Sequence, residues 1–260
     1  MKRKLVSLIF LGLSISCFGQ SHIATWDFNS AVNDAATITG TSSPNIGIGN
    51  AFSIGGSTST FSSGNPNDLN LTDNSGLNTT TYPAQGTNQK TAGLRFDVST
   101  VGFNKVVLEF YQRLSNTAAN TWVLQYTLDN SGLSTGGNIV WLDATTYTFT
   151  PAATGTGDIW YLRKFDFSAI SGLNNNTNAG FRIVSAFDPT TGTYLAARST
   201  STYSGGGTSR FDLVSFKEAE GIASIAAASN YQIVTEAVGN VIIPITFANA
   251  NNAAAKVVFE

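Results

Sequence analysis

The side chains that most often carry out catalysis are nearly missing from this sequence. Its 260 residues include one cysteine, Cys17, and one histidine, His22. A serine or cysteine nucleophile needs an adjacent base that a third group orients, and a histidine beside an expected chain start is a poor base. A catalytic zinc ion needs several histidine or cysteine ligands. Nucleophilic and zinc-dependent catalysis are therefore not expected.

Carboxylates remain as candidates for catalysis. Two acidic side chains that flank a glycosidic bond are enough to hydrolyse it. The acids that could lie in a groove are Asp97, Glu109, Asp158 and Asp166. Most of the 16 acidic residues stand singly along the chain, as solvated side chains do. The sequence favours a binding protein over an enzyme, and a glycan hydrolase is kept only as a third alternative.

Aromatic residues offer a second kind of chemistry, because their rings stack on the apolar faces of sugars beside groups that bind the hydroxyls. Trp160 shares a predicted strand face with Leu162, Lys164 and Asp166, so we expect it to point outward. Trp122 alternates with apolar residues and is expected in the core. The predicted ligand-binding residues are Trp160, Trp141, Tyr147 and Tyr111.

Residues 1–20 have the layout of a signal peptide: three basic residues, an apolar run over 5–15, then Cys17-Phe18-Gly19-Gln20. The ending resembles signal peptides of the Bacteroidetes, and cleavage is expected after Gly19 or Gln20. The apolar run is shorter than the roughly 20 residues that span a bilayer. We therefore expect an extracellular or cell-surface protein with no membrane span, and Cys17 leaves lipid anchoring open.

Removal of this leader would take three of the 14 basic residues and none of the 16 acidic ones, leaving a net charge of −5. The remaining basic residues are scattered, whereas nucleic-acid binding usually shows a basic patch. No disulfide is possible without a second cysteine. Nucleic acid is not an expected partner, and stability must come from a sizeable core.

Short β-type runs separated by Gly, Asn, Ser and Thr dominate the chain, and no helical period stands out. Alternation over 105–113 places Val106, Leu108 and Phe110 on one face and Glu109 and Tyr111 on the other. The pattern predicts an all-β sandwich. The predicted strands are 23–29, 93–98, 105–113, 122–128, 139–142, 147–150, 159–167, 181–187 and 210–216.

Residues 30–90 do not join this pattern. They are rich in Gly, Ser, Thr and Asn, with short apolar patches such as 51–54. We expect long loops that carry one or two edge strands. These loops either only cover the surface or face a ligand.

Several segments of the main domain carry a resemblance to known proteins. These segments are 23–29, 93–103, 113–118, 125–129, 180–187 and 209–214. Together they resemble the jelly-roll modules of secreted bacterial proteins from Bacteroidetes and from lineages with PEP-CTERM sorting signals. The resemblance implies a jelly-roll β-sandwich over 21–218 far more directly than it implies an activity.

More distantly, the layout is similar to carbohydrate-binding jelly rolls. In those folds an acidic residue of the last strand and residues near the first strand share a structural calcium ion. The resemblance assigns that role to Asp212, with oxygens from Asp27 or Asn29. Calcium takes six to eight hard oxygen ligands and needs neither sulfur nor imidazole. The alternative is that Asp27 and Asp212 pair with bases or cap turns.

Residues 219–260 start a fresh β-type series. The runs 228–236 and 239–245 resemble the opening of a Calx-beta-like or related immunoglobulin-like repeat, which implies a linker and a truncated Ig-like segment. The alternative is a hairpin packed on the first domain. Under the first interpretation, further domains of the same longer chain would follow.

These observations favour an exported, non-catalytic β-sandwich that binds glycan or extracellular matrix material, with a structural Ca²⁺ ion implied by the resemblance. Polysaccharide or cell-surface material is the expected partner. The alternative is a structural or adhesion spacer in front of a downstream catalytic domain, such as a nuclease, phosphoesterase or hydrolase, or a sorting domain.

Overall fold

The computed structural model describes residues 21–149, 159–219, 224–227 and 245–248. Residues 21–219 form one compact unit. In the other unit, strands β13 (Ser224–Ala227) and β14 (Ile245–Ala248) pair antiparallel. The predicted signal peptide, and most of the predicted Calx-beta-like segment, lie outside the described residues. No helix in the described part of the chain is long and apolar enough to cross a membrane.

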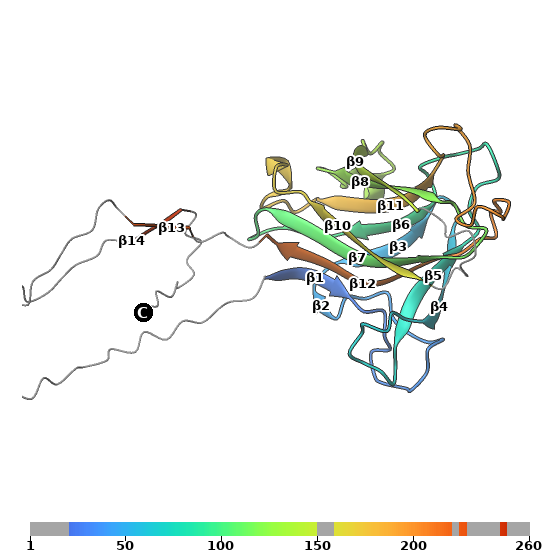
Figure 1. Cartoon of the computed structure of the whole chain (residues 1–260). Helices are drawn as coiled ribbons and strands as arrows, with labels where there is room; N and C mark the ends of the chain where they lie inside the picture. Colours follow the sequence, from blue (N-terminus) through green and yellow to red (C-terminus); the bar gives the residue numbers. More distant parts are fainter. Residues whose placement is uncertain (1–20, 150–158, 220–223, 228–244, 249–260) are drawn as a thin grey trace, which may run out of the picture. The chain divides into compact units, whose positions relative to one another are not determined.

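Two antiparallel sheets face each other in the main unit (Figure 1). One sheet, called sheet A here, runs in the order β10-β7-β12-β1-β2, and β5 joins it by pairing with β12 and β4. Its strands are β1 (His22–Trp26), β2 (Ile46–Gly47), β4 (Thr58–Ser63), β5 (Ser75–Thr80), β7 (Val106–Leu114), β10 (Trp160–Asp166) and β12 (Ser209–Glu218).

The other sheet, sheet B, runs in the order β3-β6-β11-β8-β9. Its strands are β3 (Asn50–Ile54), β6 (Gly93–Asp97), β8 (Thr121–Thr127), β9 (Leu142–Thr148) and β11 (Gly180–Ala186). The described helices are short, α1 (Gly132–Thr135) and a 3-10 turn at Ser171–Leu173. The predicted all-β sandwich is confirmed.

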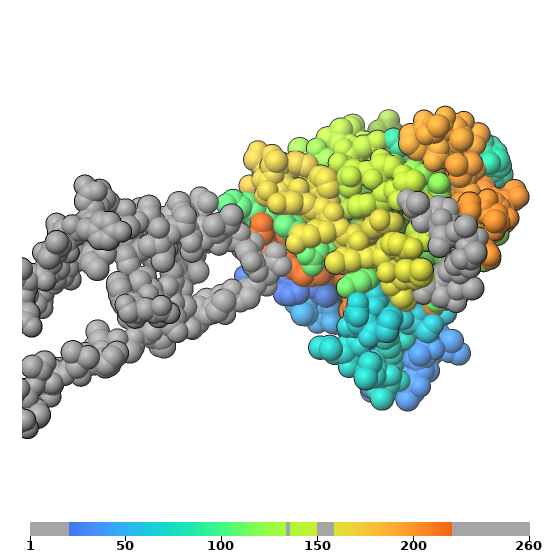
Figure 2. Space-filling view, viewed as in Figure 1, coloured from blue at the N-terminus to red at the C-terminus, as the bar shows by residue number. Residues whose placement is uncertain are grey.

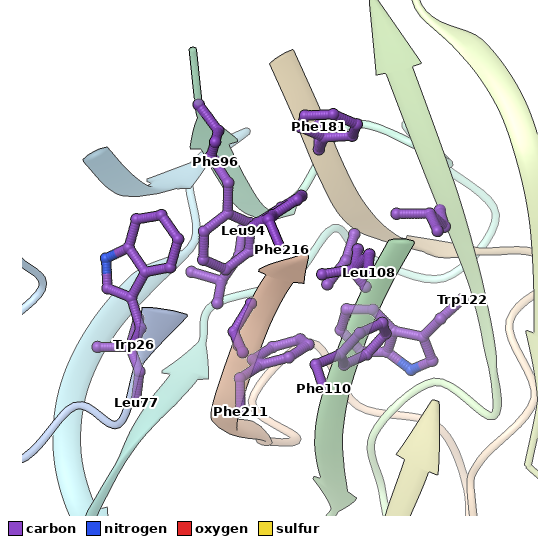
Figure 3. Close-up of a cluster of buried hydrophobic side chains, with 14 of the residues drawn as sticks. Trp26, Leu77, Leu94, Phe96, Leu108, Phe110, Trp122, Phe181, Phe211 and Phe216 are labelled. Carbon is purple, nitrogen blue, oxygen red and sulfur yellow. The ribbon is translucent and has the colours of Figure 1, made fainter. Parts of the chain in front are cut away.

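Aromatic side chains from both sheets fill the space between them (Figure 3). Trp26 of sheet A meets Phe96 of sheet B edge to face, with ring centroids 5.1 Å apart. Phe181 and Phe216 make a similar contact across the layers at 4.7 Å. Fully burying one such side chain stabilises the fold by about 1.5–3 kcal/mol. Trp122 is 1% exposed and belongs to this core, as predicted.

Two strand predictions need correction. The predicted strands 139–142 and 147–150 correspond to one strand, β9, whose seven residues pair with β8. Residues 30–90 hold four strands, β2 to β5, where one or two edge strands were predicted. β4 reads Thr-Ser-Thr-Phe-Ser-Ser, so its pairing with β5, and not an apolar face, holds it in the sheet.

Candidate functional site

A row of side chains crosses all five strands of sheet B on the face away from the core. In the strand register, Phe52 lies opposite Arg95, Arg95 opposite Arg182, Arg182 opposite Gln125, and Gln125 opposite Asp143. Residues directly opposite one another on adjacent strands share a face of the sheet. We call these five residues the cross-strand row.

The two arginines of the row each stack on an aromatic ring. The guanidinium carbon of Arg95 lies 4.5 Å from the ring centre of Phe52, and that of Arg182 lies 4.4 Å from the ring centre of Trp141. Such contacts stabilise by about 0.5–2 kcal/mol. They offset the repulsion expected between like charges on directly opposed residues.

Ion pairs neutralise most of the other charges around the row. Arg95 Nη2 lies 3.1 Å from Asp97 Oδ2, and Lys90 Nζ lies 2.5 Å from Asp143 Oδ2. Burial alone would raise the pKa of Asp143, but hydrogen bonds from Lys90 and Gln125 lower this pKa below its ordinary value. The carboxylate of Asp143 is therefore held in the charged form.

Arg182 differs from these groups. Its Nε donates to Gln125 Oε1 at 2.6 Å, and Gln125 Nε2 donates in turn to Asp143 Oδ1 at 2.6 Å. Within the described part of the chain, Arg182 forms no ion pair, and its two terminal nitrogens donate no hydrogen bond. Burial lowers the pKa of Arg182 to about 10, while the charge of Asp143 acts in the opposite direction.

Trp141 reaches this face from the segment just before β9. A Cβ placed on Gly180 would lie 3.4 Å from Trp141 Cη2 and 2.9 Å from Thr127 Cγ2. The missing side chain at Gly180 therefore leaves room for the indole over β11.

The far end of the same face is covered. Val123, Val184 and Ala186 form a small buried cluster there, with Ile54 packed against it. The backbone of Lys90 is tied to this end, because its N–H donates to Ser185 O at 2.8 Å. Along the cross-strand row, Phe52 is 41% exposed and Asp143 is exposed, whereas Gln125 is buried, so the row is most open at its two edge strands.

The four rings predicted to bind ligand lie in three places, and only Trp141 contacts the cross-strand row, through Arg182. Trp160 and Tyr111 lie on the outer face of sheet A, where Trp160 is opposite Arg113 and Tyr111 is opposite Leu162. β10, which carries Trp160, is at the surface (Figure 2, yellow).

Tyr147 packs inward. Its ring centre lies 5.8 Å from that of the buried Phe110, and its hydroxyl donates to Lys164 O. Burial raises the pKa of Tyr147 to about 12. This ring is therefore part of the packing between the sheets and not a surface platform. Arg95, Arg182 and Gln125 were missed, and only their polar type within apolar strands could have indicated them.

A second group of polar residues lies where segments 27–45 and 64–74 meet at one end of the unit (Figure 2, blue and cyan). Three carboxylates contribute: Asp27, Asp68 and Asp212. Asp212 is fully buried, and burial raises its pKa to about 8, with the charges of Asp68 and Asp27 adding to this effect. Burial also raises the pKa of Asp27. The predicted pair of Asp27 and Asp212 does come together, and Asp68 joins it.

Backbone strain accompanies Asp212. The register of β12 shifts between Asp212 and Ser215, and Leu213 has a φ of 48° in the left-handed region. This bulge lets Asp212 Oδ1 accept from Leu213 N at 2.7 Å, while Oδ2 accepts from Asn65 N at 2.6 Å. Strained backbone of this kind persists where surrounding contacts fix it.

Asn29 lies in the same place but turns its amide nitrogen toward the acids. Its Nδ2 donates to Asp68 Oδ2 at 2.7 Å, and its Oδ1 accepts from Ser75 N at 2.8 Å. In this arrangement the side chain of Asn29 positions Asp68, and its Oδ1 already accepts one hydrogen bond. Its role as a calcium ligand stays a prediction.

The oxygen atoms around Asp212 are candidate ligands for a cation. Asn74 Oδ1 is buried without a hydrogen-bond partner in the described structure. A Cβ on Gly64 would lie 1.8 Å from this oxygen and 2.6 Å from Asp212 Oδ2, so the two oxygens are neighbours. No group of three His, Cys, Asp or Glu side chains among the described residues is arranged to hold a metal ion. A cation here would need amide and backbone oxygens, which calcium accepts.

Comparisons with known proteins bear on the fold alone. No protein-family model matches the sequence, and no curated protein matches it. The first xylan-binding CBM22 domain of Xyn10C from Paenibacillus barcinonensis is 12% identical, covers 79% of this chain and 100% of its own, and has a TM-score of 0.40. The K1 cleaved adhesin domain of Lys-gingipain from Porphyromonas gingivalis W83 is 9% identical, covers 75% of this chain and 98% of its own, with a TM-score of 0.39. The PEP-CTERM-type and Calx-beta resemblances stay predictions.

Proposed function

We propose that this protein is an exported, non-catalytic module that binds a polysaccharide on the outer face of sheet B. The observation that carries the proposal is the cross-strand row, in which polar side chains lie beside two rings, Phe52 at one end and Trp141 over Arg182. Sugar-binding sites combine exposed aromatic surface with a few fixed polar groups. Adjacent strands lie about 4.8 Å apart, so a five-strand row spans roughly 19 Å. That length suits an extended chain of several sugar units better than a single sugar.

Each member of the row has a distinct part in this proposal. Phe52 supplies apolar surface at one end of the row, and Trp141 supplies it over the middle strand, where it stacks on Arg182. The free terminal nitrogens of Arg182 donate to ligand oxygens, and Gln125 fixes the guanidinium through Nε. Asp143 holds Gln125 in place. The residues are ordered by each other before ligand arrives, which lowers the entropic cost of binding.

The non-catalytic part of the proposal rests on the two carboxylates near the row. A glycosidase needs a protonated acid with a raised pKa beside a second carboxylate. Asp97 is paired with Arg95, and the pKa of Asp143 is lowered, so neither fits the role of that acid.

Affinity gel electrophoresis against soluble polysaccharides tests the binding proposal directly. The panel should include neutral xylan, mannan and mixed-linkage glucan together with a galacturonan. Retardation by at least one of them is expected. If none retards the protein, the polysaccharide proposal is wrong and the alternative of a structural or adhesion spacer takes its place.

We also propose a structural calcium ion at Asp212. The neighbouring Asp27 and Asp68 would complete the charge, and the orphaned Asn74 Oδ1 would supply a neutral oxygen. When bound, the ion would neutralise carboxylates that otherwise repel one another in a buried place. In the described structure no cationic group is hydrogen-bonded to these three acids, which argues against the alternative that they pair with bases. Asp27 and Asp212 do accept local backbone hydrogen bonds, from Asn29 N and Leu213 N, so a turn-capping role stands beside the calcium proposal.

A further inference from the structure

We infer that the polysaccharide bound by the cross-strand row is acidic, and that Arg182 binds a carboxylate of its uronic acid units. This inference rests on the proposed function and adds the class of ligand. It starts from the one property that sets Arg182 apart on this face, a half-buried positive charge with no carboxylate bound to it in the described structure.

No carboxylate of the described residues is hydrogen-bonded to Arg182, although the charge of Asp143 acts on it. Asp143 accepts from Lys90 on one oxygen and from Gln125 on the other. Asp97 is hydrogen-bonded to Arg95. Trp141 and the Gln125 oxygen offset part of the desolvation cost of the half-buried guanidinium, and a bound counter-charge would offset more of it.

The geometry of Arg182 favours a planar anion. Trp141 covers one face of the guanidinium, and the bond from Nε to Gln125 fixes its rotation. The two terminal nitrogens are left to bind together. Two parallel N–H donors match the two oxygens of a carboxylate, which is the arrangement in which arginine binds most strongly.

Arg95 does not compete with Arg182 for an anion. It lies directly opposite Arg182 in the strand register, but its charge is already paired with Asp97. Of the two opposed arginines, Arg182 is therefore the one to which a ligand carboxylate would bind.

The test compares oligogalacturonates with their methyl esters, which have the same sugar chain without the charge. Isothermal titration calorimetry at pH 7 and low ionic strength should give at least tenfold tighter binding of the acid form. Affinity for the acid form should fall as salt is added, because salt screens exposed charges. Arg182→Gln should remove the preference for the acid, and Arg182→Lys should retain part of it.

Lys164→Gln is the matched control, because it removes one positive charge from the exposed part of β10 on the other sheet. It should leave oligogalacturonate binding unchanged. Thermal melting of each variant confirms that the fold is intact.

The outcomes separate this inference from the proposed function. Binding of a neutral polysaccharide that depends on Trp141, with no preference for the acid, overturns the acidic ligand and keeps the polysaccharide site. If the protein binds sulfated polysaccharides and no carboxylated one, the inference that Arg182 binds a uronic acid carboxylate is wrong. No binding of any polysaccharide overturns both.

Discussion

Arg95 and Arg182 lie directly opposite each other on β6 and β11, and each is stacked on a ring, Phe52 for the first and Trp141 for the second. Two like charges placed this way reduce the stability of a sheet unless other contacts offset them. The stacked rings and the ion pair of Arg95 with Asp97 are those contacts. The arrangement lowers the stability of the sheet and holds positive charge at the middle of the outer face of sheet B.

Replacing Trp141 with alanine should abolish polysaccharide retardation in affinity electrophoresis while lowering the melting temperature by only a few degrees. The ring is half-buried and outside the main core, so its loss removes binding surface and one cation–π contact of about 0.5–2 kcal/mol. Trp160→Ala is the control, since Trp160 lies on the other sheet. Equal loss of binding in both variants would contradict the assignment to sheet B.

Gly180→Ala should weaken polysaccharide binding several-fold without removing any ligand-binding side chain. The added Cβ would lie 2.9 Å from Thr127 Cγ2, so this side chain must shift, and it would fill the space beside Trp141 Cη2 at 3.4 Å. Gly206→Ala, in a turn with only Ser204 Oγ nearby at 3.5 Å, should bind as the wild-type protein does. Titration calorimetry on both variants checks this, and unchanged affinity of Gly180→Ala would show that ligand does not use the surface around Gly180.

Gly64→Ala should destabilise the fold through the cluster around Asp212. The new methyl group would lie 1.8 Å from Asn74 Oδ1 and 2.6 Å from Asp212 Oδ2, so both side chains must move. Forced repacking of this kind costs about 1–3 kcal/mol, or roughly 2–10 °C in melting temperature for a domain of this size. Differential scanning calorimetry with Gly206→Ala alongside measures the effect, and equal melting temperatures would mean that the cluster tolerates the change.

The strands with strong apolar alternation could be predicted from the sequence, and the strands of residues 30–90 could not. β7 alternates the core residues Val106, Leu108 and Phe110 with Val107, Glu109 and Tyr111 on the opposite face, as predicted. The Ser- and Thr-rich β4 has no apolar face of its own and exists because β5 pairs with it. Its stability comes from a partner strand, which a local pattern does not contain.

The candidate site could be predicted from the sequence even less than the strands of residues 30–90. The proximity of Arg95 and Arg182 depends on the register between β6 and β11, which are separated by more than 80 residues of chain. Trp141 could be named as a ring from the sequence, but its position over Gly180 depends on a contact between distant segments. The resemblance to calcium-binding jelly rolls named Asp27 and Asp212, and in the structure the charge of Asp27 acts on Asp212, while their role as metal ligands stays a prediction. It did not indicate Asp68, which lies in a loop, or the orientation of the Asn29 amide.

The calcium proposal makes a prediction about pH as well as about chelation. The pKa of Asp212 is raised from 3.8 to about 8 in the folded protein. Between these values the folded state binds more protons than the unfolded state, so without metal the free energy of unfolding should fall as pH rises from about 4 to about 8. Calcium would take the place of the proton on Asp212. The gain in melting temperature on adding calcium to chelator-treated protein should therefore be small at pH 5 and several degrees or more at pH 8.

Asp212→Asn should remove both effects, since the amide neither titrates nor carries the charge that attracts the ion. Asp166→Asn, which changes an exposed acid of β10, should keep both. Melting curves at the two pH values, with calcium and with chelator, complete the comparison. The calcium proposal would be contradicted if the melting temperature falls as pH rises and does not respond to calcium. In that case the proton of Asp212 and the Asn65 and Leu213 amides stabilise this side chain without a bound ion.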